Sequence, residues 1–396
     1  MGKLTFLKGA TLITGTGKAP IENGGLLIDG KTIKKIGRTE EIQINEDIKV
    51  VDVSGKTIMP GMINCHVHII MEPVGNPFDL LIKESHTKTA MRGAANLKKH
   101  LKSGVTYFRD MGGYQFIDIE LKKCLAEGLI EGPDFLVSGK VLTMTGGHGY
   151  PMGRECDGVD EVRKAAREQL KAGADVIKIM ATGGVMTPGV EPGSPQLTRE
   201  EIQVAVEEAH KAGKKTATHA QGTTGIKNAV LAGIDSVEHG IFLDDEVIEM
   251  MVERGVYLVP TLVAPYFIIK HGVDGGIPEY AVEKSKRVME SHLESFRKAY
   301  RAGVKIAMGT DAGTPFNYHD KSAHELKLMV EAGMTPMDAI LSTTKVAAEL
   351  LGIHDNYGTL EEGKVADFLV LKENPLNNIE TLLDVEAVYK NGKLVE

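Results

Sequence analysis

The sequence predicts an α/β protein: a (β/α)8 TIM barrel carrying a small β-sandwich built from both ends of the chain. In the middle of the chain, eight short apolar runs alternate with amphipathic helical stretches, which is typical of a parallel sheet covered by helices. The two ends instead contain short strands with tight turns, and neither is long enough to bury a core alone. We therefore expect a sandwich domain at residues 1–58 plus 357–396 and a catalytic barrel at 59–356.

The terminal segments contain clear hairpin signals. An Asp29-Gly30 turn interrupts the β-rich run 26–36, and an Asn391-Gly392 turn interrupts 385–395. These dipeptides favour two-residue hairpin turns. A further strand is expected at 366–371. Since both ends are β-rich, pairing between them is the simplest way to give each a partner.

The barrel prediction rests on eight runs and on the glycines that end the helices between them. The expected strands are 58–69, 105–111, 135–139, 176–181, 215–220, 236–240, 257–262 and 305–311. Glycines expected to cap the helices are Gly173, Gly213, Gly233, Gly255 and Gly303, since glycine commonly follows the last helical turn. An open doubly wound sheet is the alternative, but no Gly-x-Gly-x-x-Gly motif follows an early strand to support a dinucleotide fold.

The amino-acid composition and net charge restrict the classes of partner and function that the protein can have. The 396 residues are 42% hydrophobic and 25% charged, with a net charge of −8, as in ordinary soluble globular proteins. No basic tract stands out, which argues against nucleic acid and membrane partners. Three cysteines without CxxC spacing, together with the lack of a signal-like or membrane-spanning segment, lead us to expect a cytoplasmic protein. A homo-oligomer is compatible with this sequence.

Six residues at or near the ends of the apolar runs are candidate metal ligands: His66, His68, Lys178, His219, His239 and Asp311. In a barrel, chemistry takes place at the carboxyl ends of the strands. His66 and His68 are two apart on one strand, so they share a face. Each histidine alone could be a hydrogen-bonded polar residue, and Asp311 alone could be a helix cap. Their joint occurrence on five strands favours a metal centre.

Lys178 lies within an apolar strand, Val176 to Met180. A charged lysine is costly to bury there. One explanation is a side chain that reaches solvent or pairs with a carboxylate. The other is an amine of lowered pKa that reacts with CO2 to form a carbamate, an anion able to bridge two metal ions.

These residues, in this order, resemble the amidohydrolase superfamily over essentially the whole chain. The entry phrase Met59-Pro-Gly-Met-Ile-Asn-Cys-His-Val-His68 and the closing phrase 358–370 are similar to that superfamily, although many members have Asp where Asn64 stands. The resemblance implies one metal on His66, His68 and Asp311 and a second on His219 and His239. N6-carboxylated Lys178 would bridge the two divalent ions, with Zn2+ the expected metal.

Further phrases resemble the imidazolonepropionase-like branch that contains Xaa-Pro dipeptidases, metal carboxypeptidases and ochratoxin-type amidases. They are 104–112, 144–149, 177–184 and 259–262. Imidazolonepropionases lack the strand lysine, so Lys178 disfavours that activity. The substrate implied is a dipeptide or another small molecule.

We therefore expect hydrolysis of an amide or peptide bond by a hydroxide that bridges the metals, with Asp311 as general base and acid. His148 and Tyr266 are expected to be catalytic and to bind the oxyanion or a substrate carboxylate, and Arg154 is a further candidate contact. Arg109 and Asp110 are more simply explained as partners of each other. The alternatives are hydrolysis of a cyclic or other small amide on the same metals, and a non-catalytic binding module.

Overall fold

The computed structural model describes residues 4–44 and 48–396, so residues 1–3 and 45–47 of the predicted sandwich domain lie outside the described residues. Its contacts divide the chain into two compact units. The first comprises Met1–Asn64, Lys98–Tyr107 and Asp320–Glu396, and the second comprises Cys65–Leu97 and Phe108–His319.

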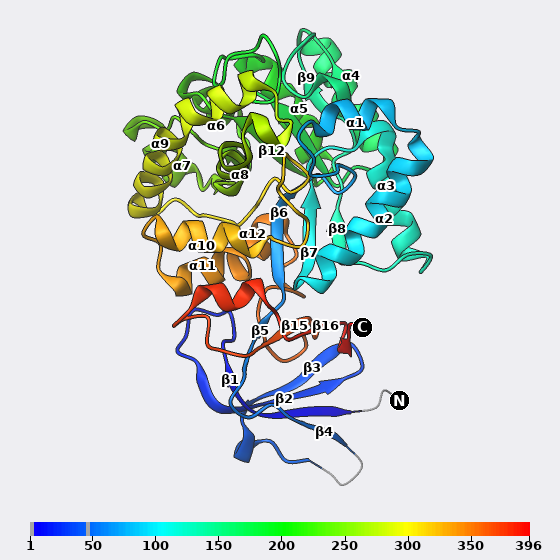
Figure 1. Ribbon diagram of the computed structural model, residues 1–396, viewed down its shortest axis with the longest axis vertical. Helices are drawn as coiled ribbons and strands as arrows, with labels where there is room; N and C mark the ends of the chain where they lie inside the picture. Colours follow the sequence, from blue (N-terminus) through cyan, green and yellow to red (C-terminus); the bar gives the residue numbers. More distant parts are fainter. Residues whose placement is uncertain (1–3, 45–47) are drawn as a thin grey trace. The chain divides into compact units, whose positions relative to one another are not determined.

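The first unit contains an eight-stranded sheet to which both chain ends contribute. Its order is β17-β16-β15-β5-β1-β2-β3, with β4 paired to β1. In Figure 1, β15 and β16 from the end of the chain lie near β5 and β1 from its beginning. The strands are β1 (Thr5–Leu12), β2 (Ile21–Asp29), β3 (Thr32–Arg38), β4 (Lys49–Asp52), β5 (Thr57–Pro60), β15 (Phe368–Leu371), β16 (Ala387–Lys390) and β17 (Lys393–Leu394).

Both predicted hairpins are present. Asp29 pairs with Thr32 across the first turn, and Lys390 pairs with Lys393 across the second, where Asn391 has a φ of 52°. Asn and Gly tolerate this left-handed conformation. The two ends of the chain join where β15 runs antiparallel to β5, which places Phe368 opposite Pro60.

An apolar core fills this unit. Leu7, Leu26, Ile58 and Phe368 belong to one buried cluster, and the Phe368 ring stacks on Tyr389 at 4.4 Å between centroids. The unit also contains three helices: α10 (Ala323–Glu331), α11 (Pro336–Ser342) and α12 (Lys345–Leu351).

The second unit alternates strands with helices. Its strands are β8 (Asp134–Leu136), β9 (Val141–Thr143), β10 (Gly153–Glu155), β11 (Val176–Met180), β12 (Lys215–Ala220), β13 (Ser236–His239) and β14 (Tyr257–Val259). Three elements cross the division between the units: β6 (Met62–Val67), β7 (Val105–Asp110) and α2 (His86–Lys102). The helices are α1 (Pro77–Lys83), α3 (Ile117–Ala126), α4 (Val159–Ala172), α5 (Arg199–Lys211), α6 (Thr223–Ala232), α7 (Asp245–Arg254), α8 (Val263–His271) and α9 (Glu279–Ala302).

Neighbouring strands of this unit are parallel. β11 pairs with β12, β12 with β13, and β13 with β14, so their carboxyl ends lie on the same side. β6, β7 and β8 form a second sheet. Backbone hydrogen bonds continue between these sets: Val176 N to Val137 O (3.3 Å), Leu258 N to Lys305 O (2.9 Å) and Cys65 N to Met308 O (2.8 Å).

The expected strands at 135–139 and 257–262 are shorter than predicted, as β8 and β14, and two others differ more. The run 58–69 is two strands, β5 and β6, separated at Gly61. Pro60 has no N–H to continue a ladder, and a side chain at position 61 would meet Thr106 at 2.2 Å. The run 305–311 forms only an isolated bridge at Ile306. A Cβ at Gly309 would meet Val259 at 2.4 Å and His66 at 2.8 Å, so this segment passes too close to its neighbours for a regular side-chain-bearing strand.

The expected glycine caps are present, with Gly173, Gly233, Gly255 and Gly303 each in a left-handed conformation at a helix end. Gly213 is not itself the C-cap of α5, which is Ala212, but it follows that residue and has a positive φ, of 68°. Within the part of the chain that the structure describes, no helix is long and apolar enough to cross a bilayer.

Phe368→Ala should destabilise the first unit because it removes a fully buried ring from the shared sheet. We expect the free energy of unfolding to fall by about 3–5 kcal/mol, as for other large-to-small core changes. Thermal and denaturant unfolding measure the loss. Leu394→Ala is the control, since Leu394 is 55% exposed, and equal stability of the two variants would contradict the assignment of this core.

Candidate active site

The predicted ligands converge on one cavity of the second unit. His66 lies near the end of β6, Lys178 within β11, His219 near the end of β12 and His239 at the end of β13. Together with His68 and Asp311 they line a cavity of about 710 Å³, a volume that includes its open mouth. Parallel strands thus bring residues from distant parts of the sequence to one end of the sheet.

The backbone at this end of the sheet is locally strained. His239, Thr261 and Asp311 have φ values of 72°, 53° and 62°, in the left-handed region that residues with side chains seldom adopt. Such strain tends to occur where a side chain must be aimed at a functional site. The strained residues turn the chain sharply at the end of β13, just after β14 and at Asp311.

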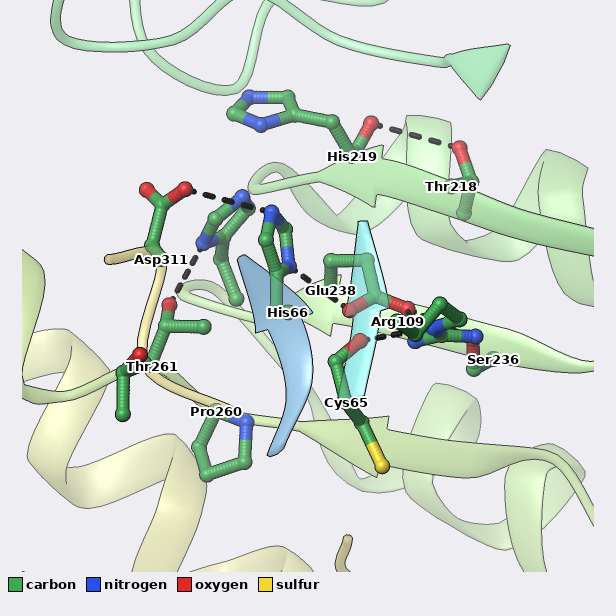
Figure 2. Close-up of polar contacts among 12 residues, drawn as sticks. Cys65, His66, Arg109, Thr218, His219, Ser236, Glu238, Pro260, Thr261 and Asp311 are labelled. Carbon is green, nitrogen blue, oxygen red and sulfur yellow. Dashed lines mark hydrogen bonds and ion pairs between the residues drawn. The ribbon is translucent and has the colours of Figure 1, made fainter. Parts of the chain in front are cut away.

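Three of the candidate ligands form a compact metal-type cluster. Oδ1 of Asp311 lies 3.3 Å from Nε2 of His66 and 3.1 Å from Nε2 of His68. One ligand atom from each residue falls within 4.8 Å of the others. Figure 2 shows the carboxylate of Asp311 facing the His66 ring. Two imidazoles and a carboxylate at this spacing are a suitable ligand set for zinc.

The other imidazoles continue the cluster. The His66 and His239 ring centroids are 5.2 Å apart, and those of His219 and His239 are 4.5 Å apart. Nε2 of His219 and Nζ of Lys178 are buried and have no hydrogen-bond partner among the described residues. Buried polar atoms are rarely left unpaired. The donor set therefore fits bound metal ions, which would give these two atoms partners.

Burial sets the charge states of these groups. It lowers the pKa values of His68, His219 and His239, the last two well below the usual value. Burial also lowers the pKa of Lys178 to about 8, against the opposing effect of Glu238 and Asp311. Neutral imidazoles are the form that binds metals. For Asp311, burial would raise the pKa, but the adjacent His66 and His68 hold it well below its ordinary value.

A buried ion pair next to the ligands was not predicted. Glu238 is fully buried and accepts hydrogen bonds from Arg109 (2.8 Å) and Ser236 (2.6 Å) through Oε1. Its Oε2 lies 2.9 Å from Nδ1 of His66. Because a carboxylate only accepts, Nδ1 carries the proton and Nε2 keeps its lone pair for a metal. Figure 2 shows this chain of contacts.

The same network corrects the expected pairing of Arg109 with Asp110. Arg109 bonds to Glu238, to Ser236 and to the carbonyl of Cys65 at 2.7 Å. Asp110 accepts instead from the backbone N–H groups of Ile69 and Gly112. The two side chains point to opposite faces because they are adjacent on β7.

His239 is held from two sides. Its Nδ1 lies 2.7 Å from the hydroxyl of Thr261, which fixes the ring and leaves Nε2 toward the other ligands. The backbone carbonyl of His239 accepts from Nε2 of His292 on α9 at 3.0 Å, and Pro260 O accepts from the same nitrogen at 2.7 Å. Helix α9 thus supports the strained ends of β13 and β14.

Residues 57–395 match the profile of the Amidohydrolase family. The chain belongs to the amidohydrolase family. It is 34% identical to ochratoxinase from Aspergillus niger over 428 aligned residues, which cover 99% of this chain and 86% of the relative. It also resembles the crystal structure of a Xaa-Pro dipeptidase with bound methionine, at a TM-score of 0.92 and 35% identity over the whole of both chains. A prolidase complexed with N-methylphosphonate-L-proline gives a TM-score of 0.92 and 32% identity, again over both whole chains.

The family predicted from the sequence is therefore confirmed, and the protein is an amidohydrolase-family hydrolase with the α/β fold of that family. The resemblance to Xaa-Pro dipeptidases is confirmed as well.

Of the three predicted substrate contacts in this amidohydrolase, one lines the cavity. His148 is buried there, with its ring 4.2 Å from that of His219 between centroids. Tyr266 on α8 is not among the described lining residues; its ring packs on Phe267 and lies 5.7 Å from Nζ of Lys270. Arg154, on the unpredicted strand β10, bonds to Glu168 at 2.9 Å.

Glu238→Gln should destabilise this amidohydrolase strongly. An amide in that position leaves the buried Arg109 without a counter-charge and removes an acceptor from His66. Breaking a buried pair costs about 3–5 kcal/mol, so the melting temperature should fall by several degrees and metal content should decrease. Glu246→Gln is the matched control, since Glu246 is exposed and pairs with Lys227 at the surface. A Glu238→Gln variant as stable as this control would exclude the structural role of the pair.

Proposed function

We propose that this protein hydrolyses an amide or peptide bond with two divalent metal ions, most simply Zn2+, and a carboxylated Lys178. The observation that carries the proposal is the convergence of four imidazoles, one carboxylate and one buried, unpartnered amine on a single cavity. Membership of the amidohydrolase family supports it. No such set is needed for stability, because each of these groups is costly to bury without a partner.

We propose the ligand roles as follows. One ion would be held by His66, His68 and Asp311. The other would be held by His219 and His239, and the carbamate on Lys178 would bind both. The lowered pKa of Lys178 favours the neutral amine, which is the form that combines with CO2. When bound, the metal ions would lower the pKa of a water molecule and polarise the scissile carbonyl.

Asp311 has two further roles in this proposal. It would accept the proton of the attacking water through its carboxylate and pass it to the leaving nitrogen, which must be protonated before the C–N bond breaks. Its side chain is 14% exposed, so it can reach both the ligand cluster and the cavity. The adjacent His66 and His68 imidazoles hold its pKa well below the ordinary value against the opposing effect of burial, so it stays ionised.

His148 would donate a hydrogen bond to the oxyanion. The hydroxyl of Thr187 accepts from Gly149 N at 3.4 Å and lies 2.8 Å from Nδ1 of His148. The hydroxyl proton can therefore go to Nδ1, which leaves Nε2–H as the ring donor. A fixed donor beside the reacting carbonyl stabilises the developing negative charge. Roles for Tyr266 and Arg154 in substrate binding stay predictions that no contact described above supports.

For the architecture, we propose that the backbone links between the eight runs close them into a (β/α)8 barrel. The links are those of Val137, Leu258 and Cys65 to their neighbours. The proposed domains are the barrel at 59–356 and a sandwich at 1–58 plus 357–396.

As substrate we propose a dipeptide with C-terminal proline, supported by the similarity to a Xaa-Pro dipeptidase and a prolidase. The second candidate is a small non-peptide amide, supported by the 34% identity to ochratoxinase. One feature of the cavity favours this second candidate. Apart from Lys178, no lysine or arginine is among the described lining residues to pair with the free carboxylate of a dipeptide. Most of the wall is apolar, including Met71, Phe78 and Met180, so either substrate should carry an apolar side chain.

Asp311→Asn should abolish turnover while most of the metal is retained. An amide still offers an oxygen ligand but cannot carry the proton, so kcat should fall at least about 100-fold. Metal analysis and steady-state kinetics on an Xaa-Pro dipeptide measure the two effects. Asp320→Asn, at an exposed position, is the control. Near-normal kcat in Asp311→Asn would rule out its role in proton transfer.

C-terminal amidation of the substrate separates the two candidate functions. A dipeptidase site bonds the free carboxylate, so an amidated dipeptide should lose at least about 100-fold in kcat/KM. The comparison uses Met-Pro against Met-Pro-amide with the zinc-loaded protein. Equal rates, or cleavage of N-acyl amides in preference to dipeptides, would contradict the dipeptidase proposal and favour the small-amide hydrolase.

A further inference from the structure

The segment between β11 and α5, residues 181–198, forms part of the cavity wall; we call it the β11–α5 loop. Its base is closed by a bridge between Thr182 and Pro195 and by a hydrogen bond from Gly183 N to Ser194 O at 2.9 Å. Val185 and Met186, nearer its tip, line the cavity. The shape of the substrate site therefore depends on where this tip is held.

Helix α9 holds the tip through Lys284. Nζ of Lys284 donates to the carbonyl of Thr187 at 2.9 Å and to the carbonyl of Val190. Tyr280, one helical turn earlier, donates from its hydroxyl to Met186 O at 3.1 Å. The carbonyls of Met186, Thr187 and Val190 are thus all bonded to one face of α9.

The Lys284 ammonium is buried and forms no ion pair among the described residues, although Glu191 of the loop exerts a favourable charge effect on it. The residue is 7% exposed, and no carboxylate of the described residues is paired with it; the Tyr280 ring lies 5.3 Å away. A buried charge is costly unless its donors are satisfied. Since the satisfying acceptors all belong to the loop, the position of the ammonium and the conformation of the loop depend on each other.

Thr187 connects this contact to the proposed chemistry. Its carbonyl accepts from Lys284, and its hydroxyl lies 2.8 Å from Nδ1 of His148. A shift of the loop tip would move the hydroxyl that orients the His148 ring. It would also move Met186, which forms part of the apolar wall.

We propose that Lys284 is a positioning residue: it fixes the tip of the β11–α5 loop so that Thr187 orients His148 and Met186 shapes the cavity. The role given to His148 rests on the proposed function, whereas the effect on the loop does not. Lys284 itself neither lines the cavity nor belongs to the ligand cluster.

Lys284→Met tests the proposal, since it keeps most of the length of the side chain and removes the ammonium that donates both hydrogen bonds. Amide hydrogen exchange of a peptide covering 183–196 should become at least about tenfold faster, while exchange in β11 stays the same. Metal content should not change. Lys286→Met is the matched control on the same helix, because Lys286 is exposed and bonds to Glu283 at the surface. Unchanged protection of 183–196 in Lys284→Met would overturn the proposal, whatever the substrate proves to be.

A double-mutant cycle with Thr187→Val tests the link to His148. Each single change should lower kcat by about tenfold to 100-fold, as expected for a misplaced catalytic group. If Lys284 acts through Thr187, the double variant should be little worse than Thr187→Val alone. Lys284→Arg, which keeps donors, should restore part of the loss. Multiplicative effects in the double variant would contradict the proposed path. If the parent protein shows no peptidase or amidase activity, the proposed function fails, and the exchange result still decides the loop assignment.

Discussion

The ion pair between Arg109 and Glu238 lies directly behind the ligand cluster, with both side chains almost completely buried. Arg109 also bonds to the carbonyl of Cys65, the residue before His66, and Glu238 bonds to the His66 ring. One pair thus fixes both the backbone and the imidazole at the end of β6. Since Glu238 precedes His239, it also ties β6 and β7 to β13. Burial would raise the pKa of Glu238, but Arg109 and His66 hold it well below the ordinary value, so the carboxylate stays charged.

Helix α9 provides a second level of support. Its side chains bond mainly to backbone groups of segments that follow strands: Lys284 and Tyr280 to the β11–α5 loop, and His292 to the residues at the ends of β13 and β14. Ser295 continues the pattern by donating to Ile241 O at 2.7 Å. A strained backbone and a long loop can hold catalytic side chains accurately only when a rigid element fixes them.

Much of this could be predicted from the sequence because it follows from local pattern. The ligand residues stand at or near the ends of apolar runs, and parallel strands bring such ends together, so the placement of His219 or His239 needs no knowledge of distant contacts. The hairpins at Asp29-Gly30 and Asn391-Gly392 follow from turn chemistry. Glu238 was missed, although a signal existed: Arg109 and Glu238 are opposite charges in two strands expected to be buried, and such charges must pair.

Other features depend on geometry that periodicity does not encode. Tyr266 was expected to bind the oxyanion or a substrate carboxylate, but α8 begins at Val263, and its helical phase directs Ala264 and Ile268 to the cavity instead. Arg154 lies on the short strand β10, where its guanidinium bonds to Glu168 of α4. The hydrogen bond from Lys284 to the Thr187 carbonyl of the β11–α5 loop joins residues 97 positions apart, and no local sequence signal marks it.

The most direct test of the two-metal site is a crystal structure of the protein reconstituted with zinc and bicarbonate, with anomalous data at the zinc edge. We expect two ions, one beside His66, His68 and Asp311 and one beside His219 and His239, with carboxylate density on Nζ of Lys178 between them. A single ion at full occupancy with an unmodified Lys178 would contradict the two-metal site and the mechanism built on it.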